Sequence, residues 1–179
     1  MVHFLNYVDE AIKKNWDKPA VSNYGANSYT YGQMAAFMER MHLLFKECGI
    51  KRGDKVALCA KNSAEWCIAY YATLTYDAVT VPFLPDFLPA AVAELGSFSE
   101  CKMLIIDDVA FNAMNATPEL YEQLEKTKDF AGVLNIKDMS VLRDTAGTLA
   151  KVYENMNDML SARHPNGLTP DSINYYKEE

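Results

Sequence analysis

The sequence lacks the short glycine motifs that mark most nucleotide-binding and hydrolytic sites. Its 179 residues contain no Gly-x-x-x-x-Gly-Lys-Ser/Thr loop, no Gly-x-Gly-x-x-Gly turn and no Gly-x-Ser-x-Gly elbow. The eight glycines are not closely paired, so no run of backbone amides is marked as a phosphate cradle. We therefore assign no catalytic, cofactor-binding or metal-binding residue from motifs of this kind.

Cysteine and histidine are too few and too scattered to predict a metal or redox site. The four cysteines show no Cys-x-x-Cys spacing and stand among apolar residues, so we interpret them as buried thiols rather than as zinc ligands or a redox pair: Cys48, Cys59, Cys67 and Cys101. The three histidines, at positions 3, 42 and 164, are far apart, and we interpret them as ordinary core or surface residues.

Positive charge is scarce as well. The chain has 17 Lys and Arg against 24 Asp and Glu, a net charge of −7, and no basic run, which disfavours nucleic acid or an anionic membrane as a partner. No apolar run approaches the roughly 18 residues of a transmembrane helix, and residues 1–15 lack a signal-peptide layout. We expect a cytoplasmic protein, in which 50% hydrophobic residues suffice for a packed core.

The most informative stretch, residues 49–82, predicts a strand, a helix and a second strand. Val56–Ala60 is apolar without polar alternation, as in a strand covered on both faces. The second strand is Val79–Val81, and Pro82 is expected to end its pairing. Two strands joined through a helix predict a parallel pair.

The helix between these strands is predicted from Ser63 to about Tyr76. Asn62 stands at the expected N-cap, with Glu65 as a capping-box partner. Apolar residues occupy nearly every face of this helix, which is typical of an internal one.

The N-terminal region predicts a helix ending near Asn15, a hairpin and a long second helix. The hairpin pairs Pro19–Tyr24 with the residues before Thr30, which is the N-cap of the second helix with Gln33 as its capping partner. Gly49 is expected to end that helix. A stripe of methionines on it could line a flexible groove, but core packing is the better interpretation.

Beyond Pro82, the loop at 83–86 follows a parallel strand, where ligands of open α/β sheets bind. Asp86 is predicted to cap a short helix at 90–95, ended by Gly96. The next strand, at 102–106, closes with Asp107 and Asp108, a pair that could bind Mg²⁺ as in bacterial receiver domains. Because residues 149–154 predict helix where a receiver needs its phosphoacceptor strand end, we favour a solvated acidic turn.

The C-terminal part predicts a helix begun by Pro118, a strand at 132–136 and an amphipathic helix over 144–160. The last helix rests on apolar residues spaced alternately four and three apart: Leu142, Ala146, Leu149, Tyr153, Met156 and Leu160. We expect residues 1–160 to form an α/β subdomain and residues 161–179 an irregular tail without packing of its own.

The predicted fold class is α/β, with a largely parallel sheet of about four or five strands, helices on both faces and an N-terminal hairpin. Four segments stand in a characteristic order and spacing: Thr30-Tyr31, Gly53-Asp54-Lys55-Val56, Asn62-Ser63-Ala64-Glu65-Trp66 and Val79-Thr80-Val81-Pro82. Together they resemble the N-terminal region of AMP-forming adenylating enzymes (the AMP-dependent synthetase/ligase family), most closely the long-chain fatty-acyl-CoA synthetases. Asp77 stands where that family usually has glycine, and Leu84 where it commonly has asparagine, so those loops are expected to differ.

The resemblance implies a parent enzyme that activates a fatty acid or other carboxylate with ATP and Mg²⁺ and passes the acyl group to CoA. The family's phosphate loop would follow a segment like Tyr175–Glu179, so the chain is expected to be an inactive N-terminal fragment without a cofactor of its own. A face meant for missing chain would be apolar and would favour a homodimer. The alternative is a stand-alone α/β binding or interaction module, supported by a natural stop at Glu179 rather than a gene that continues.

Overall fold

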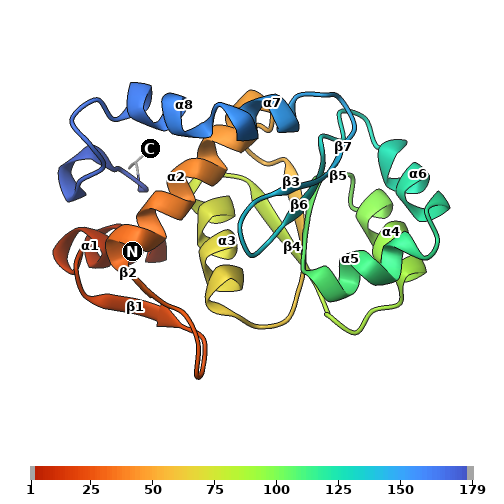
Figure 1. Cartoon of the computed structure of the whole chain (residues 1–179), viewed down its shortest axis with the longest axis horizontal. Coiled ribbons are helices and arrows are strands. Elements are labelled where there is room, and N and C mark those ends of the chain that lie inside the picture. Colours follow the sequence, from red (N-terminus) through yellow and green to blue (C-terminus); the bar gives the residue numbers. More distant parts are fainter. Residues whose placement is uncertain (1–2, 177–179) are drawn as a thin grey trace.

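The computed structural model describes residues 3–176, which form a five-stranded main sheet and a two-stranded hairpin (Figure 1). The main sheet has the order β4-β3-β5-β6-β7, in which β4, β3, β5 and β6 are parallel and β7 is antiparallel to β6. Its strands are β3 (Lys55–Cys59), β4 (Val79–Phe83), β5 (Cys101–Ile106), β6 (Gly132–Asn135) and β7 (Val141–Asp144). The hairpin pairs β1 (Pro19–Ser22) with β2 (Ser28–Thr30). The predicted α/β class, mostly parallel sheet and hairpin are confirmed.

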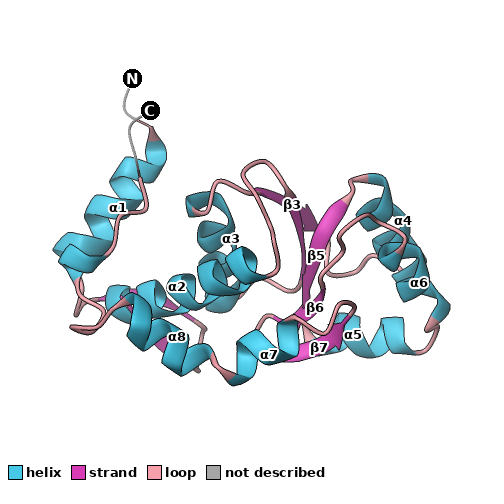
Figure 2. Cartoon of the chain, turned by 90° about the horizontal axis from the view of Figure 1, so that it is seen from above, coloured by secondary structure: helices cyan, strands magenta, loops and turns pink. Residues whose placement is uncertain are grey.

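Helices cover both faces of the sheet, as predicted (Figure 2). The helices are α1 (Phe4–Lys14), α2 (Tyr31–Glu47), α3 (Ala64–Thr75), α4 (Pro89–Phe98), α5 (Asp108–Asn115), α6 (Glu119–Glu125), α7 (Leu149–Glu154) and α8 (Met156–Arg163), followed by a 3-10 turn at Pro170–Ser172. Successive residues of β3 point alternately to the two faces of the sheet, and each face is covered by a different set of helices. Val56 and Leu58 join the core formed with α2 and α3, whereas Ala57 and Cys59 join the core formed with α4, α5 and α6. All four are buried, which explains the unbroken apolar run.

Helix α2 begins with the capping box that the sequence predicts. The Thr30 hydroxyl accepts a hydrogen bond from the Gln33 amide at 3.2 Å, and the Gln33 side chain accepts one from the Thr30 amide at 2.9 Å. This reciprocal pair satisfies two amides that have no partner inside the helix. The methionines of α2 lie in the core, so the packing interpretation is confirmed: Met34, Met38 and Met41.

The N-cap of α3 is Ser63 and not Asn62. The Ser63 hydroxyl accepts a hydrogen bond from the Trp66 amide at 3.0 Å, because its extended backbone carries the side chain over the first turn. The predicted partner Glu65 instead faces the hairpin, as described below.

Three predictions around β4 and α4 were also wrong. Pro82 lies within β4, opposite Leu58 in the register. Proline has no backbone N–H to donate, but β4 is an edge strand, so the open side of the strand can accommodate it without loss of a hydrogen bond to a neighbour. Asp86 does not cap α4, which begins at Pro89 and runs through Gly96 to Phe98. Gly96 is a contact point rather than a stop, because a Cβ there would lie 2.5 Å from a Leu124 methyl group of α6.

The predicted helix over 144–160 was wrong in its first part and interrupted in its second. Residues 141–144 form β7 against the open side of β6, and Gly147 turns the chain with φ +69°. The apolar stripe is divided between the two layers, since Leu142 packs with the α4–α6 core and Leu149 with the α2–α3 core. Asn155 separates α7 from α8 and bonds back to the Lys151 carbonyl at 2.8 Å.

Asp77 takes the backbone conformation for which glycine is favoured. Its φ is +66°, which Asp tolerates better than most residues, and its carbonyl accepts a hydrogen bond from the Gly53 amide at 2.8 Å. Asp77, in the turn between α3 and β4, therefore has a left-handed backbone conformation at the position where AMP-forming adenylating enzymes usually have glycine.

Candidate functional site

At the carboxyl ends of the parallel strands, the acidic pair Asp107 and Asp108 follows β5 and accepts hydrogen bonds from neighbouring loops. Asp107 accepts hydrogen bonds from the Lys61 amide at 3.0 Å and the Ala110 amide at 2.9 Å, so it caps α5 and ties the loop after β3. Asp108 accepts from the Asn135 side chain at 2.7 Å. Within residues 3–176 no group of three or more His, Cys, Asp or Glu side chains is placed to hold a metal. Both carboxylates therefore accept hydrogen bonds from the protein, and Asp107 has a structural role as the N-cap of α5.

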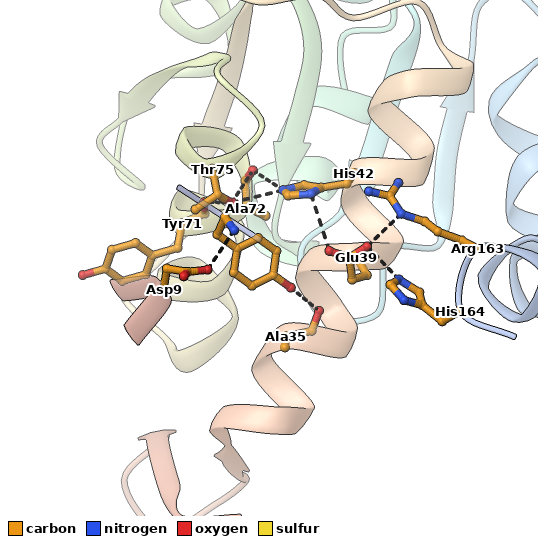
Figure 3. A network of polar contacts seen from close by, with 10 residues as sticks. Asp9, Ala35, Glu39, His42, Tyr71, Ala72, Thr75, Arg163 and His164 are labelled. Atoms are coloured by element: carbon orange, nitrogen blue, oxygen red, sulfur yellow. Dashed lines mark hydrogen bonds and ion pairs between the residues drawn. The ribbon is translucent and has the colours of Figure 1, made fainter. Parts of the chain in front are cut away.

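A second polar cluster lies on the other side of α2, away from the sheet, and is centred on Glu39 (Figure 3). Oε2 of Glu39 lies 3.0 Å from Nε2 of His164 and 3.0 Å from Nε of Arg163, and Oε1 lies 3.9 Å from Nδ1 of His42. The Glu39 side chain is only 4% exposed. A carboxylate so buried depends on its cationic and N–H partners to offset the loss of hydration.

His42 connects the cluster to α3. Its Nε2 lies 2.9 Å from the Ala72 carbonyl and 3.1 Å from the Thr75 hydroxyl, which itself donates to the Tyr71 carbonyl at 2.7 Å. Burial lowers the pKa of His42 to about 4, so the ring is neutral near pH 7 and donates its Nε2 proton to the helix end. This imidazole therefore joins α2 to α3 through its Nε2 atom.

The C-terminal residues complete the cluster. The Tyr175 amide donates to Oδ1 of Asp9 at 2.8 Å, and its hydroxyl donates to the Ala35 carbonyl at 3.2 Å. Burial, together with the nearby Glu39, raises the pKa of the Tyr175 phenol well above its ordinary range. Tyr175 and Ile173 are both buried, so this end of the chain packs against α1 and α2 although its sequence had predicted no packing.

Another polar network joins the hairpin to α3. Glu65 accepts hydrogen bonds from the Tyr29 hydroxyl at 2.6 Å and the Asn23 side chain at 2.9 Å, and Asn23 accepts one from the Ala64 amide at 2.7 Å. Burial opposes ionisation of Glu65, but these hydrogen bonds lower the pKa of its carboxyl group. Burial and the Glu65 carboxylate raise the pKa of Tyr29 to about 12.

The thiols carry no reactive character. All four cysteines are free; Cys59 and Cys101 are buried, and Cys48 and Cys67 are half-buried, so the buried interpretation holds fully for two of them. Burial raises the pKa of Cys59 to about 11, which keeps it protonated. Within the described residues, no helix is long and apolar enough to cross a membrane.

The sequence located the acidic pair at the end of β5 but predicted a solvated turn, whereas Asp107 caps α5 and Asp108 bonds to Asn135. It did not predict either polar network. Glu39 and His164 are 125 positions apart, and Glu65 and Asn23 are 42 apart. The one local indication was an ionisable residue, Glu39, three positions before His42 inside an otherwise apolar helix face.

The helix-covered sheet and its hairpin match part of the N-terminal domain of FACL13 from Mycobacterium tuberculosis, with a TM-score of 0.55 at 23% identity, over 69% of this chain and 36% of that one. The model of the family described as "AMP-binding enzyme" matches residues 8–175, and the chain belongs to that family. It is 31% identical over 97 residues to surfactin synthase subunit 2 of Bacillus subtilis, covering 54% of this chain and 3% of the relative. It is 36% identical over 76 residues to the long-chain-fatty-acid–CoA ligase FadD13 of Mycobacterium tuberculosis, covering 42% of this chain and 15% of the relative.

Solved structures agree at the level of the fold. The fatty acyl CoA synthetase of Mycobacterium tuberculosis superposes with a TM-score of 0.60 at 23% identity, over 81% of this chain and 27% of that one. The coronafacic acid ligase of Pectobacterium brasiliense does so with a TM-score of 0.60 at 20% identity, over 71% of this chain and 25% of that one. The chain thus spans about a quarter of the length of these structures.

Proposed function

We propose that this chain is the N-terminal part of an ATP-dependent acid–thiol ligase. In this proposal the whole enzyme converts a carboxylate and ATP into an acyl-adenylate and then forms a thioester with CoA. The observation that carries it is the family match over residues 8–175, nearly the whole described chain. Among the relatives, the matching fatty-acid ligase supports a fatty acid as the carboxylate. The name of the surfactin synthase relative gives no support to the CoA step.

The part played by this segment is that of a scaffold. The Asp107 and Asp108 carboxylates accept hydrogen bonds from protein N–H groups, which supports a structural role for this pair. His42 is neutral and held by α3, and Glu65 is held by the hairpin. We therefore assign the binding of ATP, Mg²⁺ and CoA to other parts of the proposed enzyme, where Mg²⁺ would neutralise the phosphates.

Calorimetric titration of the folded chain with ATP–Mg²⁺, an acyl-adenylate analogue and CoA tests this assignment. We expect no heat of binding with any of the three, and no carboxylate-dependent exchange of pyrophosphate into ATP. Circular dichroism and cooperative unfolding of the same sample serve as the control that the chain is folded. Binding of ATP at micromolar concentration would contradict the scaffold role, because it requires a phosphate site within these residues.

A stand-alone binding or interaction module is the second candidate. Two observations would distinguish the ligase hypothesis from the module hypothesis: the coding sequence after residue 179, and the activity of the protein that the gene encodes. A reading frame that continues into a loop rich in Ser, Thr and Gly, with a product that exchanges pyrophosphate, supports the ligase. A stop codon after Glu179 in the transcript supports the module.

A further inference from the structure

A small pocket of about 180 Å³ lies where α2 meets the β6–β7 turn and the junction of α7 with α8. Residues from all of these elements line it: Arg40, Asp138, Met139, Tyr153, Met156 and Asn157. The Met139 backbone is left-handed, with φ +62°, and its side chain is buried beside the buried Met156. The two methionines therefore give the pocket an apolar wall, and the other four residues give it polar groups.

Arg40 is the cation of this pocket, and the protein alone does not satisfy its guanidinium group. Its one polar contact is long, with Nη2 lying 3.4 Å from Oδ1 of Asn157. The Nε atom is shielded from solvent without a hydrogen-bond partner, and no carboxylate of residues 3–176 lies within ion-pair distance. Arg163, by contrast, pairs with Glu39. Because the donors of a guanidinium group match the oxygens of an oxyanion, Arg40 indicates an oxyanion ligand.

Two more donors and one acceptor are available in the pocket. Within the described chain, the Asn157 Nδ2 atom and the Tyr153 hydroxyl make no hydrogen bond. Asp138 accepts a hydrogen bond from the Ser140 amide through Oδ1 at 2.9 Å, and its other oxygen has no partner among these residues. A carboxylate repels an anion that has only acceptor oxygens, but it accepts a hydrogen bond from an anion that keeps a proton.

We infer that this pocket binds hydrogen phosphate, with Arg40, Tyr153 and Asn157 donating to its oxygens and its O–H group donating to Asp138. The inference goes beyond the proposed ligase function and does not depend on it. The pocket is smaller than the roughly 300 to 1,000 Å³ of typical small-molecule sites, so it is too small for ATP and the expected absence of ATP binding is unchanged.

Calorimetric titration of the full chain at pH 7.5 and constant ionic strength compares hydrogen phosphate with sulfate. Both are tetrahedral dianions at this pH, but only hydrogen phosphate carries an O–H group. We expect saturable binding of phosphate and binding of sulfate that is weaker by about tenfold or more. Methyl phosphate should behave like sulfate, because a phosphate monoester has a second pKa of about 6 and has lost its O–H proton.

Nuclear magnetic resonance locates the bound ion. The Nε–H resonance of Arg40, identified by its absence in Arg40→Gln, should shift as phosphate is added and should shift much less with sulfate. This measurement reports on the pocket itself, since a phosphate ion bound elsewhere on the surface would leave the resonance unchanged.

Arg40→Gln should weaken phosphate binding by about tenfold or more, because it removes the charge and the paired donors. The matched control is Lys46→Gln, an exposed cation on the same helix, which should leave the affinity unchanged. Asp138→Asn keeps an acceptor for the Ser140 amide and adds an N–H donor. It should bring the affinities for sulfate and phosphate within about twofold of each other, and it provides a test if Arg40→Gln does not fold.

Three outcomes would overturn the inference. Equal affinities of the wild type for sulfate and phosphate would exclude a hydrogen bond to Asp138. Phosphate binding as tight in Arg40→Gln as in Lys46→Gln would exclude the guanidinium as a ligand. A titration to about 20 mM phosphate without heat and without a shift of the Arg40 resonance would show that the pocket does not hold the ion.

Discussion

Gly132, the first residue of β6, lies directly against the carbonyl group of Arg143 in β7. Its φ is +144°, and the Arg143 carbonyl oxygen and a Leu149 methyl group occupy the space that a Cβ would need. The glycine therefore allows the last strand to approach β6 and allows α7 to pack onto the sheet.

Gly132→Ala should destabilise the domain by about 3 kcal/mol or more, because backbone strain adds to a collision with backbone atoms that cannot rotate away. Gly147→Ala is the control. Gly147 also has a positive φ but nothing within 4 Å of its would-be Cβ, so about 1 kcal/mol is expected from strain alone. Urea unfolding followed by circular dichroism measures both, and equal losses would argue against the close approach of β7.

Stability should fall with acid because of His42. Its folded pKa of about 4 lies below the ordinary value of 6.5, so the unfolded chain binds the proton more tightly. This contribution is complete above about pH 6.5 and is lost as the pH falls toward 4, by up to about 3 kcal/mol. Unfolding free energies at pH 7, 5.5 and 4.5 should vary less in His42→Gln than in the wild type. An identical pH profile for the wild type and His42→Gln would refute the buried-histidine account.

Tyr29→Phe should weaken the attachment of the hairpin to α3. The change removes the 2.6 Å hydrogen bond to the Glu65 carboxylate, and a bond to a charged acceptor contributes about 1 to 2 kcal/mol. Tyr24→Phe, at a fully exposed position of the same hairpin, should have no effect on thermal unfolding. If the two substitutions lowered the melting temperature equally, the Glu65 contact would contribute nothing measurable.

Self-association is expected through the outer face of α4. Leu88, at the N-cap of α4, and Leu95 and Phe98 within the helix are spaced seven and three apart and are 75%, 37% and 85% exposed. An apolar stripe in this position favours contact between two copies. Static light scattering should show a mass that rises with concentration, and Phe98→Glu should suppress the rise while Tyr24→Glu does not. A monomeric mass at every concentration would contradict this prediction.

Short-range patterns were sufficient for much of the fold. Thr30 and Gln33 predicted the start of α2 because a capping box involves residues only three apart. The apolar run of β3 predicted burial on both faces, and the order of strand, helix and strand predicted parallel pairing. The order and spacing of the adenylating-enzyme segments predicted the family. In each case the relevant interactions lie within one element or between neighbours along the chain.

The sequence by itself thus determined the class of the fold, the family and the beginning of most elements. Only the tertiary structure decided that 141–144 joins β6 rather than the following helix, and that Glu39 meets Arg163 and His164. These outcomes depend on an open strand edge and on a buried carboxylate in need of partners, which are created by folding itself. Periodicity along the chain cannot report them, because the contacts join residues that approach one another only when the core has formed.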